Sequence, residues 1–232
     1  AFDYKKPTTQ VLNEELSKLA DNNFAKLHPE YLIRFDNKLI LDPGIPEVQE
    51  FITSSILEVV NNYDIDAVHF DDYFYPYKTT RDGKAVVFGD LGEDQETFQK
   101  YGQAFNGDIK AWRINNIDTL IKKVSDAIKD SKPYVKFGIS PFGIWGHEAN
   151  HPGIGSHTPI TSSASFDDIY ADTRKWVKEE WIDYITPQIY WAFGTVAAPY
   201  AELVDWWSEV VRDTNTHLYI GPANYKHNDA YW

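Results

Sequence analysis

The stretch that decides the fold is Asp66-Ala67-Val68-His69-Phe70-Asp71-Asp72-Tyr73-Phe74-Tyr75-Pro76. Its first half reads as a buried strand, in which Val68 and Phe70 share one face and His69 and Asp71 share the other. A strand with such a polar face is costly to bury unless that face borders a cleft. The stretch therefore predicts a strand that runs into a site formed by carboxylates and aromatic rings.

Helices and strands alternate on both sides of this stretch. The segments 73–110 and 141–166 show no sustained period, and both follow strands. Alternation predicts parallel strands joined by crossover helices, and long segments after strands favour a barrel with its site at the carboxyl ends. An open doubly wound sheet would also have long segments after its strands, but the Gly-rich phosphate-binding motif typical of such sheets is missing. The hydrophobic spacing predicts helices over about 46–62, 114–128, 167–180 and 200–211, strands over about 65–71, 135–140, 182–190 and 218–221, and a hairpin over 32–41.

The composition narrows the class of ligand. The chain has 22 basic and 35 acidic residues, a net charge of −13, which argues against nucleic acid or an anionic membrane surface as partner. Aromatic residues make up 16%, more than a core needs, so some rings are expected to line a binding surface. There is no cysteine, which excludes disulfides and thiolate metal sites, and no apolar run has the length of a membrane helix. A neutral ligand such as a carbohydrate fits best.

Six blocks carry a resemblance to a known family. They are Leu41 to Val48 (LDPGIPEV), Tyr63 to Pro76 (YDIDAVHFDDYFYP), Trp112 to Asn116 (WRINN), Val135 to Trp145 (VKFGISPFGIW), Trp181 to Trp191 (WIDYITPQIYW) and Tyr219 to Gly221 (YIG). In these blocks the chain resembles the glycosyl-hydrolase-like family 10 of bacterial envelope proteins. The blocks run in order over nearly the whole chain.

The resemblance implies a (β/α) TIM barrel, of which this chain holds a part, about strands four to seven of eight. We expect residues 1–232 to form a single glycoside-hydrolase-like barrel domain that is truncated at both ends. The resemblance also implies an exported protein, periplasmic or at the cell surface and often lipid-anchored. Its expected activity is hydrolysis of O-glycosidic bonds in an envelope or extracellular polysaccharide, with the glycan strands of peptidoglycan as the leading substrate. We expect no cofactor.

Glycoside hydrolysis generally needs two carboxyl groups, one protonated acid and one nucleophile or base. Asp71 is the first candidate, because it lies in phase with His69 at the carboxyl end of its strand. Asp72 is one step out of phase, which makes it either a second acid or a structural partner of Arg113. Glu148, in the segment that follows the strand ending at Ser140, is the third candidate.

Other polar and aromatic side chains are candidates for sugar binding. Gln188 and Tyr190 share a phase and can hydrogen-bond to hydroxyl groups, whereas rings can stack on the apolar faces of sugars. The alternative for each ring is packing between a loop and the barrel rim, and for the residues that open a helix it is a cap or an ion pair. The candidate substrate-binding residues are His69, Tyr73, Tyr75, Arg113, Asn115, Trp145, Gln188, Tyr190 and Trp191.

Two other kinds of function remain open at this point. His69, Asp71 and Asp72, together with the histidines at 147, 151 and 157, are the ligand types of a hydrolytic metal site, although their spacing matches no metal-binding motif. A glycan-binding module that keeps the cleft without catalysis is the other alternative.

Overall fold

The computed structural model describes residues 3–228 of the chain and divides it into two compact units. The first unit comprises Ala1–Ile52 and Pro76–Asn116, and the second comprises Thr53–Tyr75 and Ile117–Trp232. The division falls within the helices α3 (Pro46–Asn62) and α5 (Ile109–Ser131). The prediction that residues 1–232 form one barrel domain stays a prediction.

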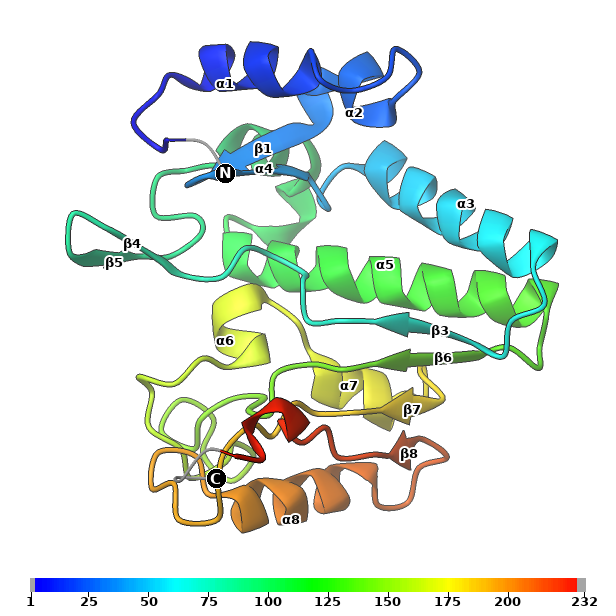
Figure 1. Cartoon of the computed structure of the whole chain (residues 1–232), viewed down its shortest axis with the longest axis vertical. Helices are drawn as coiled ribbons and strands as arrows, with labels where there is room; N and C mark the ends of the chain where they lie inside the picture. Colours follow the sequence, from blue (N-terminus) through cyan, green and yellow to red (C-terminus); the bar gives the residue numbers. More distant parts are fainter. Residues whose placement is uncertain (1–2, 229–232) are drawn as a thin grey trace. The chain divides into compact units, whose positions relative to one another are not determined.

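The first unit is built around two small antiparallel hairpins (Figure 1). Strands β1 (Leu32–Phe35) and β2 (Lys38–Leu41) form the first hairpin, which the sequence predicted. Strands β4 (Thr79–Arg81) and β5 (Lys84–Val86) form the second, inside the segment 73–110 for which the sequence showed no period. The short helical elements of this unit are α1 (Thr8–Leu16), α2 (Phe24–Leu27), η1 (Pro29–Tyr31), α4 (Gln95–Tyr101) and η2 (Gln103–Phe105).

The second unit contains a four-stranded parallel sheet with the order β3-β6-β7-β8. Figure 1 shows the four arrows side by side and pointing the same way, with the segments after β6 and β7 looping beyond the arrowheads. The parallel order and the crossover helices were therefore predicted correctly from the alternation of elements. The strands are β3 (Ala67–Phe70), β6 (Lys136–Ile139), β7 (Tyr184–Ile185) and β8 (His217–Leu218).

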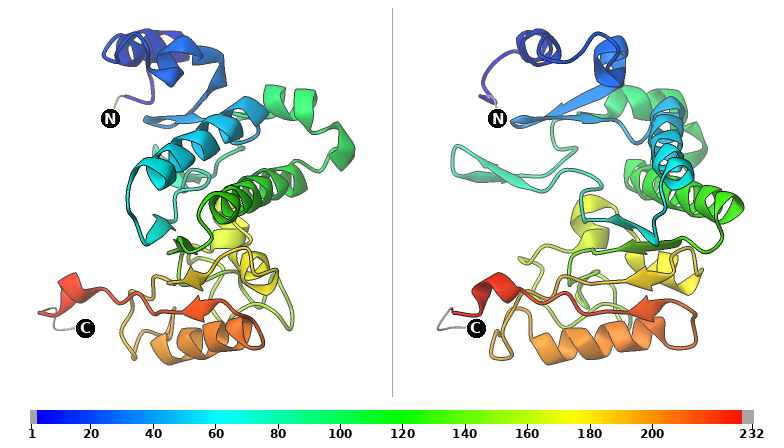
Figure 2. Two further views of the ribbon diagram at one scale, coloured as in Figure 1. Left: turned by 90° about the vertical axis from the view of Figure 1, so that its right-hand side faces the viewer. Right: turned by 45° about the vertical axis from the view of Figure 1, so that its right-hand side comes forward.

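Helices cover one face of this sheet. Because side chains alternate between the two faces of a strand, every second residue points toward these helices. Phe137, Ile139 and Ile185 are buried, whereas His69 on the opposite phase is exposed. Figure 2 shows α7 (Thr173–Lys178) and α8 (Tyr200–Val211) running alongside the strands. The remaining elements of this unit are α6 (Ser165–Ile169) and η3 (Asn224–Lys226).

Strand β3 is less buried than the sequence predicted. Val68 and Phe70 are half-buried, and Ala67 and His69 are exposed. The alternation of the two faces is correct, but β3 pairs only with β6 among the described strands and lies at an edge of the sheet. The prediction of a buried strand with one polar face is therefore met only in part, because the apolar face of β3 is half-buried and its polar face is exposed. No helix in residues 3–228 combines the length and the apolar character needed to cross a bilayer.

Candidate active site

The carboxyl ends of three neighbouring strands bring Asp71, Ser140 and Gln188 together. Asp71 follows β3, Ser140 follows β6, and Gln188 lies three residues beyond β7. Because Gln188 forms isolated parallel bridges with Phe142 and Gly221, its backbone is fixed within the sheet beyond the regular strands. Its Nε2 donates to Asp71 Oδ1 and to the Ser140 carbonyl, each at 2.8 Å. Both amide hydrogens of Gln188 are thus used to hold the ends of β3 and β6.

The two carboxylate oxygens of Asp71 have different environments. Oδ1 accepts from Gln188 at 2.8 Å, from the backbone N–H of Asp72 at 3.0 Å and, more weakly, from Ser140 Oγ at 3.5 Å. No described residue donates to Oδ2, and the residue as a whole is exposed. Asp71 therefore has one oxygen that the protein holds and a second oxygen to which no described residue donates.

His69 is connected to the same cluster through Ser140. Its Nε2 lies 2.9 Å from Ser140 Oγ, and its Nδ1 lies 3.0 Å from the Tyr184 hydroxyl. Although the residue is exposed as a whole, partial desolvation of its ring lowers the pKa of His69, and this effect outweighs the opposing influence of the Asp71 charge. The imidazole is therefore neutral at pH 7, with one nitrogen donating and the other accepting.

The close approach of Tyr184 to the sheet depends on a glycine. A Cβ at position 138 would lie 2.1 Å from Tyr184 Cζ, so any larger residue there would displace the ring. The ring also stacks on His69, with centroids 5.6 Å apart and planes inclined at 17°. Gly138 in β6 therefore permits the contact that orients His69.

Asp72 and Asp71 differ as their phases predicted. Asp72 is buried, with 5% of its surface exposed, whereas Asp71 is exposed at the rim. Burial, and then the negative charges of Asp71 and Asp72, raise the pKa of the Tyr190 phenol. Tyr190 is thus a protonated hydroxyl within electrostatic reach of both carboxylates.

The candidate aromatic residues divide into exposed and buried ones. Tyr73 is 71% exposed and Trp191 is half-buried, so both rings have surface to offer a sugar. Tyr75 is 1% exposed and packs edge-on against Tyr170. Trp145 is 5% exposed and donates from Nε1 to Asp172 Oδ1 at 3.0 Å. For Tyr75 and Trp145 the packing alternative accounts for the contacts that the structure shows.

Glu148, Arg113 and Asn115 are three further candidates from the sequence. Glu148 Oε1 accepts from the backbone N–H of Gly153 at 2.8 Å, and the residue borders a separate cavity of about 390 Å³ beside α7 and α8. Arg113, in the first unit, is buried and donates from Nε and Nη2 to Asp94 at 2.7 and 2.6 Å. Asn115 is exposed on α5. These three substrate or catalytic assignments stay predictions.

The histidines of the metal-site alternative have partners of other kinds. His147 is buried and lies 2.8 Å from Thr158 Oγ1, and His151 lies 2.9 Å from Asp167 Oδ1. His157 pairs with Glu202 at 3.3 Å. Within residues 3–228, no three His, Asp or Glu side chains come together as a metal ion would require.

Two members of the cluster were not predicted as site residues. Ser140 is in phase with Lys136 and Gly138 at the end of β6, and Tyr184 begins β7. The same period that selected His69 and Asp71 on β3 would have selected Ser140 on β6. Tyr184 had no such signal, because its contact with His69 depends on the registers that place β3 and β7 on either side of β6.

Parallel strands with a carboxylate, an amide and a histidine at their carboxyl ends are typical of α/β enzymes. The chain belongs to the glycosyl hydrolase-like 10 family, whose model matches residues 9–232. It is 47% identical over 217 residues to glycosyl hydrolase YngK of Bacillus subtilis, covering 94% of this chain and 41% of that protein. It is 45% identical over 222 residues to glycosyl hydrolase DigH of Escherichia coli, covering 96% of this chain and 47% of that protein. The chain thus spans less than half the length of these relatives.

A solved structure of a GH36 α-galactosidase from Geobacillus stearothermophilus, in complex with 1-deoxygalactonojirimycin, matches 87% of this chain and 26% of that chain. The sequence identity is 15% and the TM-score is 0.31, too low for a comparison of the two folds.

Proposed function

We propose that the protein is a glycoside hydrolase that cleaves O-glycosidic bonds of a bacterial envelope or extracellular polysaccharide, with peptidoglycan glycan strands as the first substrate to test. Membership of a glycosyl hydrolase-like family supports the class of reaction. The observation that carries the proposal is the asymmetric environment of Asp71, with three donors on Oδ1 and an open Oδ2.

In this proposal Asp71 is the ionised carboxylate of the pair that glycoside hydrolysis requires. As nucleophile it would attack the anomeric carbon through Oδ2, and as base it would take a proton through the same atom from the water that attacks this carbon. In either case the bond from the anomeric carbon to the glycosidic oxygen breaks, and the protonated partner gives its proton to the departing oxygen. Gln188 and Ser140 keep Oδ1 occupied, so that Oδ2 is the oxygen presented to the substrate. Asp72 and Glu148 are the candidates for the protonated partner. Their separation from Asp71 in a sugar complex distinguishes retention, at about 5 Å, from inversion, at about 6.5–9.5 Å.

We propose further that the parallel sheet is part of a (β/α) barrel. Its edge strands β3 and β8 each have one neighbour among the described strands, and the face that bears His69 and Tyr219 is exposed. In a closed barrel every strand has two neighbours and that face is the interior. The family resemblance supports export, with the protein periplasmic or at the cell surface and lipid-anchored. Fractionation of cells that make the tagged protein tests this part.

The central test is hydrolysis by the purified protein. Glycan strands stripped of their peptides, and other soluble polysaccharides, are offered to the wild-type protein, to Asp71→Asn and to the control Asp64→Asn, which changes an exposed carboxylate before β3. We expect reducing ends to appear with the wild type and with Asp64→Asn and to be lost with Asp71→Asn. Hydrolysis that survives in Asp71→Asn contradicts the proposal. Binding without hydrolysis in the wild type would identify a glycan-binding module instead, and loss of activity with a chelator would identify a metal-dependent hydrolase.

A further inference from the structure

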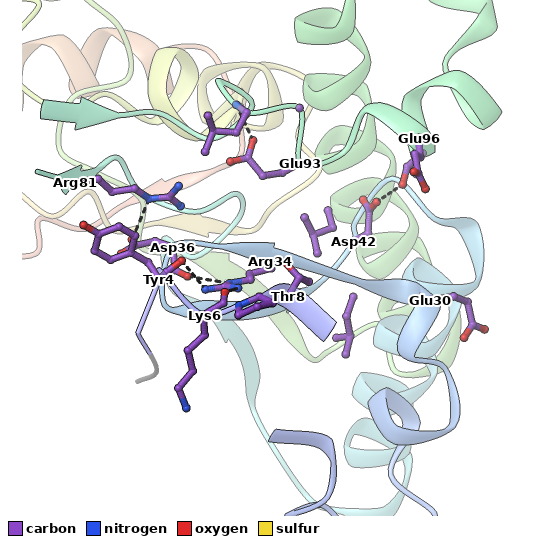
Figure 3. Close-up of a pocket in the computed structure, with 16 residues that line it drawn as sticks. Tyr4, Lys6, Thr8, Glu30, Arg34, Asp36, Asp42, Arg81, Glu93 and Glu96 are labelled. Atoms are coloured by element: carbon purple, nitrogen blue, oxygen red, sulfur yellow. Dashed lines mark hydrogen bonds and ion pairs between the residues drawn. The ribbon is translucent and has the colours of Figure 1, made fainter. Parts of the chain in front are cut away.

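Two carboxylates that line a cavity of the first unit have side-chain donors close by. The cavity has a volume of about 570 Å³ and is shown in Figure 3. Arg81 Nε donates to Asp36 Oδ1 at 3.2 Å, and Thr97 Oγ1 donates to Asp42 Oδ2 at 2.5 Å. The Asp71 cluster of the second unit is different, because its hydrogen bonds continue from one side chain to the next before they reach the carboxylate.

Four side chains from neighbouring strands form this continuous series. The Tyr184 hydroxyl lies 3.0 Å from His69 Nδ1, and His69 Nε2 lies 2.9 Å from Ser140 Oγ. Ser140 Oγ in turn lies 3.5 Å from Asp71 Oδ1. We call this series the Tyr184–Asp71 network. Hydroxyl groups and a neutral imidazole both donate and accept, so the position of the single imidazole hydrogen decides the direction of the network.

The two possible directions differ in the number of hydrogen bonds that they form. If Nδ1 of His69 carries the hydrogen, it donates to Tyr184, and Ser140 donates to Nε2. The hydroxyl hydrogen of Tyr184 then has no acceptor among the described residues, and Asp71 receives no hydroxyl hydrogen. If Nε2 carries the hydrogen, Tyr184 donates to Nδ1, Nε2 donates to Ser140, and the hydroxyl of Ser140 is free to donate to Asp71 Oδ1. Every hydrogen of the network then lies in a hydrogen bond, which favours this second direction.

The surroundings of Tyr184 and Ser140 also favour the second direction. Burial is the main cause that raises the pKa of the Tyr184 phenol, so this group keeps its hydrogen at neutral pH. Ser140 Oγ has another acceptor at 3.5 Å, the Phe70 carbonyl, but that oxygen already accepts the Ser140 backbone N–H at 2.8 Å. A hydrogen bond to an ionised carboxylate is about twice as strong as one between neutral groups. The Ser140 hydroxyl is therefore expected to donate to Asp71, which is ionised in the proposed reaction.

We propose that Tyr184, His69 and Ser140 are positioning residues that act in series on Asp71, with their hydrogens directed toward its carboxylate. The proposal rests on the proposed function, because it assumes that Asp71 takes part in the reaction. Tyr184 keeps the imidazole hydrogen on Nε2, His69 thereby turns the hydroxyl of Ser140, and this hydroxyl occupies Oδ1 so that Oδ2 is left for the substrate. Both ring nitrogens of His69 are then engaged, so His69 positions Asp71 and does not bind the sugar as the sequence predicted.

NMR of the isotope-labelled protein measures the position of the imidazole hydrogen. Long-range proton–nitrogen correlations at about pH 8 distinguish a protonated ring nitrogen from an unprotonated one, and the signals of His69 are identified by their loss in His69→Gln. We expect Nε2 to carry the hydrogen in the wild type. Tyr184→Phe keeps the ring and removes the hydroxyl, so we expect its Nδ1 signal to move toward that of a nitrogen without a donor.

Deletion of two hydroxyl groups tests whether the residues act in series. We expect Ser140→Ala to lower kcat for glycan hydrolysis about tenfold with little change in KM, and Tyr184→Phe to lower it about threefold or more. In the double variant Ser140→Ala/Tyr184→Phe, kcat should equal that of Ser140→Ala, because Tyr184 acts on Asp71 only through Ser140. Tyr134→Phe removes the hydroxyl of an exposed tyrosine just before β6 and is the matched control.

The proposal is overturned if Nδ1 of His69 carries the hydrogen in the wild type, or if the Nδ1 signal is unchanged in Tyr184→Phe. It is also overturned if the effects of Ser140→Ala and Tyr184→Phe on kcat multiply in the double variant. Thermal unfolding shows that each variant compared is folded. A wild-type protein that hydrolyses no glycan contradicts the proposed function, whereas the NMR spectra still decide the direction of the Tyr184–Asp71 network. An active protein with the hydrogen on Nδ1 keeps the proposed function and refutes the positioning in series.

Discussion

Asp42 provides a prediction whose size follows from the structure. It lies between β2 and α3 and is 1% exposed. Its Oδ1 accepts from the backbone N–H of Gly44 at 2.8 Å and its Oδ2 accepts from Thr97 Oγ1 at 2.5 Å. Burial, opposed by these two hydrogen bonds, raises the pKa of Asp42 from 3.8 to about 6. Between these two pKa values, Asp42 is therefore mostly protonated in the folded protein and mostly ionised in the unfolded chain.

The sign of the effect follows from proton binding. Between pH 3.8 and about 6 the folded state binds more protons than the unfolded state, so the free energy of unfolding falls as the pH rises through this window. The full difference between the two pKa values corresponds to about 3 kcal/mol, reached above the folded pKa. Asp42→Asn removes this titration while its amide can keep the contacts with Gly44 and Thr97. We expect the variant to gain stability relative to the wild type as the pH rises from about 4 to about 7.

Urea unfolding followed by tryptophan fluorescence measures this difference at each pH. The contributions of other titrating groups cancel when the free energy of unfolding of Asp42→Asn is subtracted from that of the wild type. The Asp64→Asn variant shows how much an exposed carboxylate contributes to the pH dependence. A wild-type-minus-variant difference that stays constant over the window would refute a protonated, buried Asp42. So would an equal change in Asp64→Asn.

Three further changes test other contacts. Gln188→Ala removes both hydrogen bonds that fix Asp71 and Ser140. We expect kcat for glycan hydrolysis to fall about 10- to 100-fold with little change in KM. An effect on KM alone would contradict a positioning role for Gln188. Gly138→Ala sets a methyl group against the Tyr184 ring and should lower the free energy of unfolding by about 1–3 kcal/mol in urea titrations; an unchanged midpoint would show that the ring moves freely. Arg113→Met leaves the buried Asp94 unpaired and should cost about 3–5 kcal/mol of stability; a normal melting curve with a raised KM would instead support the predicted substrate role of Arg113.

The long, regular elements could be predicted from the sequence because their signals are local. Helix α3 begins at Pro46 and ends at Asn62, as the hydrophobic spacing indicated, and proline is favoured at the first helical position. The predicted helix over 167–180 is instead two short helices, because Tyr170 adopts φ 57° and ends α6 before α7 begins. The hairpin β4–β5 was missed although Asp82 and Gly83, at φ 49° and 76°, are a typical two-residue turn. Its strands are too short to show a period.

The candidate site could be predicted only as far as the phase of each strand allowed. The two-residue period of a strand distinguished the exposed Asp71 from the buried Asp72. It also selected Gln188, which lies with Asp71 at the carboxyl ends of the strands. It could not separate Tyr73, which is exposed, from Tyr75, which packs on Tyr170, because both have the same phase. Which ring reaches a ligand depends on packing between segments distant in the sequence.

The contacts that hold Asp71 are independent of how the rest of the sheet is completed. His69 lies on β3, Ser140 follows β6, and Gln188 lies beyond β7. The hydrogen bonds of the cluster join β3 to β6, β6 to β7 and, across β6, β3 to β7. The ionised partner of the proposed reaction is thus fixed by three strands that this chain contains. In the proposed barrel, a protonated partner placed on another strand would be brought close only by the curvature of the sheet. A substitution in the Asp71 cluster should therefore change chemistry without changing the fold, and the acid is to be sought among carboxylates that face the same rim.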